Sequence, residues 1–289
     1  MPAFIKLLRP HQYVKNLFVF FPLFFALKIT DLNLVKDALL AFLAFCFAAS
    51  TIYIINDIRD IEKDRAHPKK KKRPLAKGDI SVMTAIAIAA ILFFFSIILA
   101  LMSGNNLLII ISIYIVMNFF YSFGLKNISL IDIFIIATGF LLRLLAGTEF
   151  GAVQGVNPSH WIIIMTFLLS LFIAFAKRRD DLILAEKGVS VRKSIEGYSI
   201  DFVNNAMGVM SGVLIVSYLL YTLDEKVISH FNTEYLYVTT VFVILGVFRY
   251  MQISLVFMKS GSPTEILFKD KFLQLTIVGW AVLFLLLVY

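Results

Sequence analysis

The sequence has few charged residues and only one cysteine. Asp, Glu, Lys and Arg make up 16% of the 289 residues, whereas soluble domains carry about a quarter. Cys46, the only thiol, excludes an intramolecular disulfide and any metal site built from several cysteines. The longest polar loops, of roughly 25 residues, are too short to bury a core of their own. An appended soluble domain is therefore not expected.

Hydrophobic residues are abundant instead and form long runs. They make up 60% of the chain, with 29 Phe and a mean hydropathy of +0.87. A membrane-spanning helix needs about 20 apolar residues. We predict an all-α, polytopic membrane bundle of about nine helices, with residues 1–289 as a single domain. The apolar stretches are 13–30, 35–56, 82–102, 106–123, 129–147, 158–176, 203–223, 235–258 and 271–289.

The first of these stretches is the least regular, because Pro22 interrupts it. A secretory signal peptide is the alternative interpretation of this segment. No small-residue cleavage site follows Ile29, which argues against that alternative.

Basic residues predict the orientation, because cytoplasmic loops hold an excess of Lys and Arg. With a cytoplasmic N-terminus, the inside segments hold 22 of the 27 basic residues and the outside loops hold 3. The other two, Arg143 and Arg249, lie inside apolar stretches. This asymmetry predicts that the N-terminus and the most polar loops face the cytoplasm, in a cell inner membrane.

The stretch NDIRDIEKDRAHPKKKKRPLAKG, residues 56–78, is the most polar interruption. If the preceding helix continues, Asp57, Asp60 and Asp64 lie at i, i+3 and i+7 on one face, while Arg59 and Lys63 point elsewhere. Clustered carboxylates repel one another unless a cation neutralises them, and Mg²⁺ prefers carboxylate and phosphate oxygens. A solvated, salt-bridged helix end is the alternative, and the spacing alone does not decide between them.

The end of this stretch is a basic loop broken by prolines and a glycine. For Lys69–Lys72 we favour attraction to anionic lipid headgroups. Arg73 and Lys77 are better candidates for a specific contact. Acids that hold Mg²⁺ beside cations that hold phosphate are what a pyrophosphorylated substrate requires.

A second charged cluster, AKRRDDLILAEKG at residues 176–188, follows the stretch 158–176. Lys177, Arg178, Asp181 and Glu186 again mix cations with acids. Taken alone, this is an ordinary helix end. Its position four helices after the first cluster hints at an internal duplication.

Ionisable residues inside apolar stretches are a further indication of a site, since they are costly at membrane depth. Asp132, Arg143 and Arg249 are of this kind. The two arginines could instead be structural, pairing with helix-end carbonyls or with Glu149. Lys126 and Asp132 fall at the predicted cytoplasmic edge and could join the site.

The motif N-D-x-x-D-x-x-x-D, formed by Asn56, Asp57, Asp60 and Asp64, resembles the first aspartate-rich motif of the UbiA superfamily of intramembrane prenyltransferases. That resemblance covers the whole chain and implies that these residues bind Mg²⁺ and a diphosphate at the cytoplasmic mouth of a helical bundle. Typical members carry a second D-x-x-x-D, but KRRDDLILAE has no aspartates at that spacing.

Other segments resemble the decaprenyl-phosphate phosphoribosyltransferase branch of that superfamily. They are LRPHQYVKN, YSFGLKNISLIDIFIIATGFLLRLLAG and GSPTEILFKDK. This resemblance implies transfer of 5-phosphoribose from phosphoribosyl pyrophosphate to a polyprenyl phosphate, with an excess of cations to hold three phosphate groups. Displacement would be in line, without a general base, because the acceptor phosphate is already an anion.

The site residues that follow from this resemblance fall into three groups. The metal ligands are Asp57, Asp60 and Asp64. The catalytic candidates are Asp57, Asp60 and Lys177. The substrate-binding candidates are Lys15, Asn16, Asn56, Lys63, Arg73, Lys126, Asp132, Arg178 and Glu186. His11 and His67 fall near the site but are not assigned a role.

Three alternatives remain at this point. A UbiA-type enzyme could move an isoprenyl group from its diphosphate to an aromatic or lipid acceptor. A carrier or channel could use Arg143 and Arg249, but it leaves the aspartates unexplained. A phosphatidyl-type alcohol transferase lacks the expected D-G-x-x-A-R sequence.

The expected partners are phosphoribosyl pyrophosphate, a polyprenyl phosphate lipid and membrane lipids, with no nucleic acid. Gly139 and Gly147 would allow close helix contacts, either within one subunit or in a homo-oligomer.

Overall fold

The computed structural model describes residues 2–66, 70–189, 191–258 and 263–288. Within these ranges the chain is helical and contains no β-strand, which confirms the all-α prediction. The chain folds as two compact units, Met1–Ser159 and His160–Tyr289. The prediction of one membrane domain over 1–289 stays a prediction. His67 and Lys69 lie outside the described residues.

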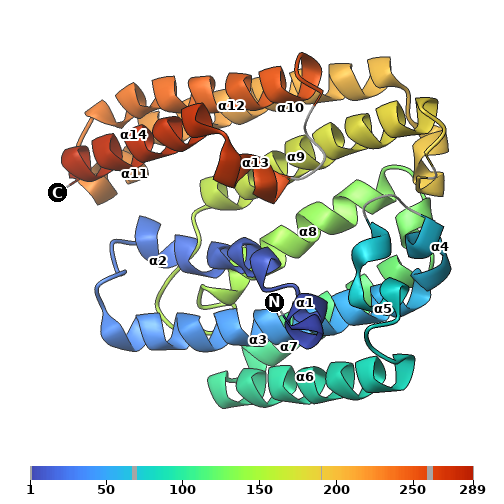
Figure 1. Cartoon of the computed structure of the whole chain (residues 1–289). Coiled ribbons are helices and arrows are strands. Elements are labelled where there is room, and N and C mark those ends of the chain that lie inside the picture. Colours follow the sequence, from blue (N-terminus) through green and yellow to red (C-terminus); the bar gives the residue numbers. More distant parts are fainter. Residues whose placement is uncertain (1, 67–69, 190, 259–262, 289) are drawn as a thin grey trace. The chain divides into compact units, whose positions relative to one another are not determined.

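The first unit contains eleven helices in its described residues, coloured blue to green in Figure 1. They are α1 (Ala3–Leu8), the 3₁₀ helix η1 (Pro10–Phe20), α2 (Phe21–Phe25), α3 (Leu32–Arg59), α4 (Ile61–Ala66), η2 (Lys70–Lys72), α5 (Pro74–Lys77), α6 (Val82–Ser103), α7 (Asn105–Phe123), η3 (Leu125–Asn127) and α8 (Ile131–Ala146).

The second unit contains eight helices in its described residues, coloured yellow to red in Figure 1. They are α9 (His160–Glu186), η4 (Lys193–Gly197), α10 (Ile200–Leu223), α11 (Glu225–Phe231), η5 (Tyr235–Thr239), α12 (Thr240–Leu255), α13 (Pro263–Lys269) and α14 (Lys271–Val288). Helix α9 packs against α10, and α12 packs against α14.

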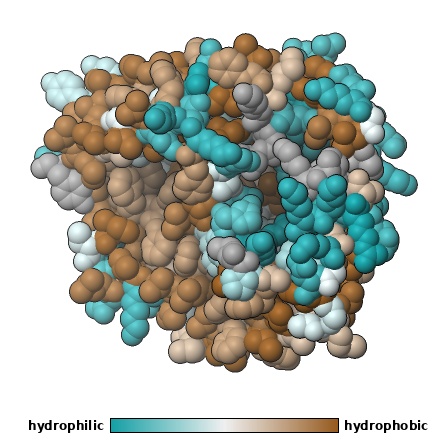
Figure 2. Space-filling model, in the orientation of Figure 1, coloured by the Kyte–Doolittle hydropathy of each residue, from teal (hydrophilic) through white to brown (hydrophobic). Residues whose placement is uncertain are grey.

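Seven helices in the described part of the chain are long and apolar enough to span a membrane. They are α3, α6, α7, α9, α10, α14 and the continuous segment η5–α12. Much of the face seen in Figure 2 is hydrophobic. The chain is thus an integral membrane protein by its helices and composition, whereas the count of nine spans and the orientation of the N-terminus stay predictions.

Two of the nine predicted stretches form shorter helices. Residues 13–30 form part of η1 and then α2, and the backbone leaves the helical region at Leu27, whose φ is 56°. Pro22 explains part of this break, because proline has no amide hydrogen to continue a helical ladder. Residues 129–147 form α8, which has 16 residues.

Helix α3 is the centre of the first unit, and its caps show how the sequence defines it. The Asp31 carboxylate accepts hydrogen bonds from the amides of Asn33 and Leu34 at 2.9 and 3.3 Å, so it caps the N-terminus. Small residues on α3 let α6 and α7 pack closely against it. Those that are fully or almost fully buried are Ala38, Ala41, Ala44, Ala48 and Ala49.

A close backbone contact fixes η1 against the C-terminal end of α8. A Cβ atom added at Gly147 would lie 1.8 Å from the carbonyl oxygen of Val19, so only glycine fits there. The same two elements are joined by a side-chain network around Asn16 and Arg143. The N-terminal segment is therefore held firmly against the bundle that carries the aspartate motif.

Candidate active site

The aspartate motif spans the end of α3 and the start of α4. Asp60 is the C-cap of α3, yet the helical hydrogen bonds continue through it, from Asp60 N to Asn56 O at 3.0 Å and from Asp64 N to Asp60 O at 2.8 Å. Asp57 and Asp64 are each 2% exposed. The structure therefore places the three carboxylates on consecutive helical turns and buries two of them.

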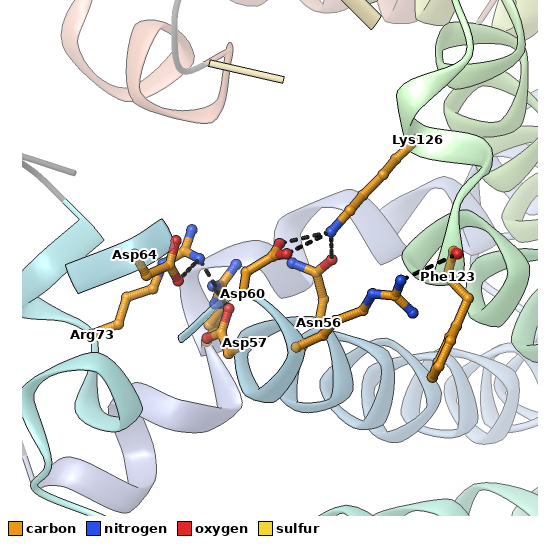
Figure 3. A network of polar contacts seen from close by, with 9 residues as sticks. Asn56, Asp57, Asp60, Asp64, Arg73, Phe123 and Lys126 are labelled. Atoms are coloured by element: carbon orange, nitrogen blue, oxygen red, sulfur yellow. Dashed lines mark hydrogen bonds and ion pairs between the residues drawn. The ribbon is translucent and has the colours of Figure 1, made fainter. Parts of the chain in front are cut away.

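Arg73 brings Asp57 and Asp64 together. Its Nη1 atom donates to Asp57 Oδ1 at 3.0 Å and to Asp64 Oδ2 at 2.6 Å, as Figure 3 shows. Arg73 is the N-cap of α5 and has an extended backbone conformation. Its side chain points back toward the motif (Figure 3). A charge-assisted pair of this kind compensates the cost of burying the carboxylates.

Arg9 is a second partner of Asp57 that sequence reasoning missed. Its Nη2 atom donates to the same Oδ1 atom, and its guanidinium lies 5.3 Å from the ring centroid of Tyr53. Arg9 adopts a left-handed backbone conformation, with φ of 54°, between α1 and η1. The segment LRPHQYVKN contains this residue, but no motif or spacing pairs it with a residue 48 positions away.

Lys126 holds the other side of the motif. Its Nζ atom donates to both carboxylate oxygens of Asp60, at 2.9 and 2.7 Å, and to Asn56 Oδ1 at 3.0 Å (Figure 3). Lys126 comes from η3, between α7 and α8, and is 8% exposed. The predicted substrate-binding residues Asn56, Arg73 and Lys126 thus lie together with the three aspartates.

Arg59 and Lys63, two other charged residues near the motif, lie apart from this network. Arg59 donates to the carbonyl oxygen of Phe123 at 3.3 Å and stacks over its ring at 4.3 Å. Lys63 is exposed on α4, so the structure does not bring it to the carboxylates. Asp132 is fully buried in the first turn of α8.

Asn16 and Arg143 form a separate polar network inside the first unit. Arg143 Nε donates to Asn16 Oδ1 at 2.6 Å, and Asn16 Nδ2 donates to the sulfur of Cys46 at 3.2 Å. Arg143 also donates to the carbonyl oxygen of Gly139 and to the hydroxyl of Tyr114, at 2.6 and 2.9 Å. Lys15, the neighbour of Asn16, is half-buried and experiences the positive charges of Arg143 and Arg9.

The second charged cluster lies at the end of α9 in the second unit. Arg178 is fully buried and pairs with Asp181, while Lys177 is half-buried and Glu186 is exposed. The neighbouring Arg179 binds Asn204 Oδ1 at 2.9 Å and the carbonyl oxygen of Ser254 at 2.7 Å, so it ties α9 to α10 and α12.

The chemistry of the donor set suits a hard divalent cation. Asn56, Asp57, Asp60 and Asp64 offer only oxygen as a ligand, which Mg²⁺ prefers. Across the described residues, however, no three His, Cys, Asp or Glu side chains converge into a ready-made cluster. The carboxylate oxygens instead accept hydrogen bonds from arginine and lysine nitrogens. A metal ion would have to displace these nitrogens.

Buried acids held by cations at the end of a membrane helix fit the class of intramembrane enzymes that bind phosphorylated substrates. Comparison identifies the protein further: the model of the UbiA prenyltransferase family matches residues 17–196, and the chain belongs to that family.

Several relatives are similar over nearly the whole chain. A decaprenyl-phosphate phosphoribosyltransferase of Corynebacterium glutamicum is 34% identical over 99% of this chain and 86% of its own. The enzyme of that name from Mycolicibacterium smegmatis is 33% identical over 96% and 89%. Among solved structures, a UbiA homolog from Archaeoglobus fulgidus bound to GPP and Mg²⁺ superimposes with a TM-score of 0.69. It is 18% identical, with 99% of this chain and 96% of that one covered, and shows the shared fold.

Proposed function

We propose that this protein transfers 5-phosphoribose from phosphoribosyl pyrophosphate to a polyprenyl phosphate and releases pyrophosphate. The observation that carries the proposal is the nearly full-length identity to decaprenyl-phosphate phosphoribosyltransferases, at 34% and 33%. The absence of a second D-x-x-x-D in KRRDDLILAE supports it, since an isoprenyl diphosphate donor typically meets two such motifs in this family.

The reaction is a single in-line displacement at C1 of the ribose. An oxygen of the lipid phosphate forms the new bond to C1, and the bond from C1 to the pyrophosphate oxygen breaks, with its electron pair leaving on pyrophosphate. The attacking phosphate is ionised at neutral pH and needs no base. Catalysis then consists of positioning and of stabilising the leaving group. Inversion at C1 is expected, and retention would contradict a single step.

The residues of the first unit divide this work by charge. Asp57 and Asp60, with Asp64, are the proposed Mg²⁺ ligands, and Asn56 orients them. Bound Mg²⁺ neutralises charge on the pyrophosphate. Arg73 and Lys126 now bind the carboxylates, at 2.6–3.0 Å.

If the carboxylates held Mg²⁺, Arg73 and Lys126 would be able to bind the phosphate oxygens. Lys177 and Arg178 are the proposed cations of the second unit. We place the active site on the cytoplasmic side of the cell membrane, which the excess of basic residues in the predicted inside loops supports.

The second candidate is transfer of an isoprenyl group from its diphosphate. The solved A. fulgidus homolog bound to GPP and Mg²⁺ favours it, but at 18% identity that likeness concerns the fold. An assay that offers both donors decides between the two. Detergent-solubilised protein with Mg²⁺ and polyprenyl phosphate receives ribose-labelled phosphoribosyl pyrophosphate, or a prenyl-labelled isoprenyl diphosphate with a quinone precursor. Ribose label in the lipid phase supports the proposal, and prenyl transfer without ribose transfer refutes it.

A further inference from the structure

Arg143 is a buried cation that no carboxylate neutralises in the described part of the chain. It is 5% exposed, and its three hydrogen bonds go to neutral acceptors on Asn16, Gly139 and Tyr114. A buried ion without a counterion is costly in a protein interior and more so at membrane depth. A buried, uncompensated charge at this position calls for an explanation beyond helix packing.

Aromatic rings surround the Arg143 guanidinium. Its Cζ atom lies 4.8 Å from the ring centroid of Tyr114, 5.5 Å from that of Phe45 and 5.6 Å from that of Phe140. Ring faces stabilise a cation without neutralising it. The positive charge is therefore held in place but not neutralised.

Lys15 adds a second positive charge to the same region. It precedes Asn16, which binds Arg143, and none of the described residues forms a hydrogen bond or an ion pair with its ammonium group. Lys15 is repelled by Arg143 and by Arg9. Two like charges in a region of low dielectric constant repel strongly, and a bound dianion would relieve that repulsion.

We propose that Arg143 and Lys15 form a subsite for a phosphate monoester. The inference rests on the proposed function, which requires two monoesters: the 5-phosphate of the donor and the phosphate of the lipid. The three aspartates of the motif already pair with Arg9, Arg73 and Lys126. We therefore assign these three cations to the pyrophosphate. Arg143 binds Asn16, Gly139 and Tyr114 and no aspartate, and together with Lys15 it serves one of the remaining phosphates.

The decisive variant is Asn16→Asp. Asn16 is 1% exposed, and its Oδ1 atom is 2.6 Å from Arg143 Nε, so an aspartate of the same shape supplies an internal counterion. Folding is expected to be preserved, because the new charge is paired. Arg143→Gln is the second variant, and Lys36→Gln, at an exposed position on α3, is the control. Each of the three changes lowers the net charge by one.

Binding is measured as the rise in Tm of the purified protein, without metal, with ribose 5-phosphate or with farnesyl phosphate. We expect one of these monoesters to stabilise the wild type and Lys36→Gln, and Asn16→Asp and Arg143→Gln to lose that response. KM for the corresponding substrate should rise about tenfold or more, as for loss of a charge-assisted hydrogen bond. The substrate affected identifies the source of the phosphate, and loss of both responses supports a subsite that accepts either monoester.

The proposal is overturned if Asn16→Asp responds to both monoesters as the wild type does, or if neither monoester stabilises the wild type. A purely structural Arg143 predicts the first of these results. If the wild type transfers no phosphoribose but its monoester response still disappears in Asn16→Asp, the proposed reaction fails and the subsite stands.

Discussion

Arg73 bridges Asp57 and Asp64 through a single nitrogen, at 3.0 and 2.6 Å. The two carboxylates are seven residues apart and each is 2% exposed, so this guanidinium neutralises charges that water reaches poorly. A divalent cation would bind the same oxygens. The carboxylates are therefore held together by cations of the protein itself, whose places a metal would take.

This relationship predicts how Arg73→Gln behaves. The variant leaves Asp64 without its described ion-pair partner and should be less stable by about 1–3 kcal/mol. Mg²⁺ should raise its Tm more than that of the wild type, because the freed oxygens bind the metal without displacing an arginine. Arg65→Gln, which removes an exposed pair with Glu62, is the control and should change stability by less than about 1 kcal/mol. Equal Mg²⁺ responses in Arg73→Gln and wild type would contradict this account.

Lys126→Met should mainly affect donor binding. Lys126 contacts Asp60 and Asn56, and the proposed role of its charge is to hold the donor's phosphate oxygens. We expect KM for phosphoribosyl pyrophosphate to rise about tenfold or more. Lys28→Met removes a lysine that binds the carbonyl oxygen of Gly155, and it should leave this KM unchanged. Steady-state kinetics at varied donor concentration measures KM for both variants. Equal changes of KM in Lys126→Met and Lys28→Met would show that Lys126 does not bind the donor.

Gly147→Ala should prevent stable packing of η1 against α8. The new Cβ atom would lie 1.8 Å from the carbonyl oxygen of Val19, a backbone atom that cannot move alone. Gly246→Ala is the matched control, because its Cβ atom would meet only ordinary contacts, 3.6 Å from Thr276. Size-exclusion chromatography of the detergent-solubilised variants should show folded protein for Gly246→Ala and aggregate or loss of yield for Gly147→Ala.

Asp270 links stability of the second unit to pH. The pKa of Asp270 is lowered chiefly by the side-chain hydrogen bond from Arg249. The hydrogen bond from the amide of Leu273 lowers it further. A lowered pKa in the folded state means that the stabilisation is present above the unfolded pKa of about 3.9 and is lost as pH falls through the folded value. Asp270→Asn should therefore lower Tm at pH 7 by an amount equivalent to about 1 kcal/mol or less. The difference from wild type should shrink below about pH 4, and a pH-independent difference would contradict the ion-pair explanation.

The sequence predicted the helical class from the length of its hydrophobic runs, and it predicted that Asn56 and Arg73 lie near the aspartates from their closeness in the chain. Lys126, 66 residues from Asp60, was predicted from its place at the cytoplasmic edge of the bundle and from the family resemblance. The sequence did not predict that residues 13–30 form η1 and α2 in place of one long helix. Pro22 indicated an interruption there, but the run of apolar residues did not reveal the backbone turn at Leu27.

The sequence also did not predict contacts between segments that are far apart in the chain. Arg9 reaches Asp57 from 48 residues away, and Arg143 reaches Asn16 from 127 residues away. Packing of η1 against α3 and α8 forms both contacts. Neither contact could therefore be predicted from a local helical or loop spacing. Lys63 shows the reverse case, as a residue near the motif in sequence that stays exposed on α4.

One assay directly measures the transfer of ribose at the aspartate motif. The assay measures two products together: labelled ribose in the lipid phase and released pyrophosphate. It compares the wild type with Asp57→Asn and Asp37→Asn. Asp37 lies on the same helix away from the motif and is the control. The account predicts equal amounts of both products in wild type and control, with a loss of about a hundredfold or more in Asp57→Asn. Pyrophosphate released without ribose reaching the lipid, or full transfer by Asp57→Asn, would contradict it.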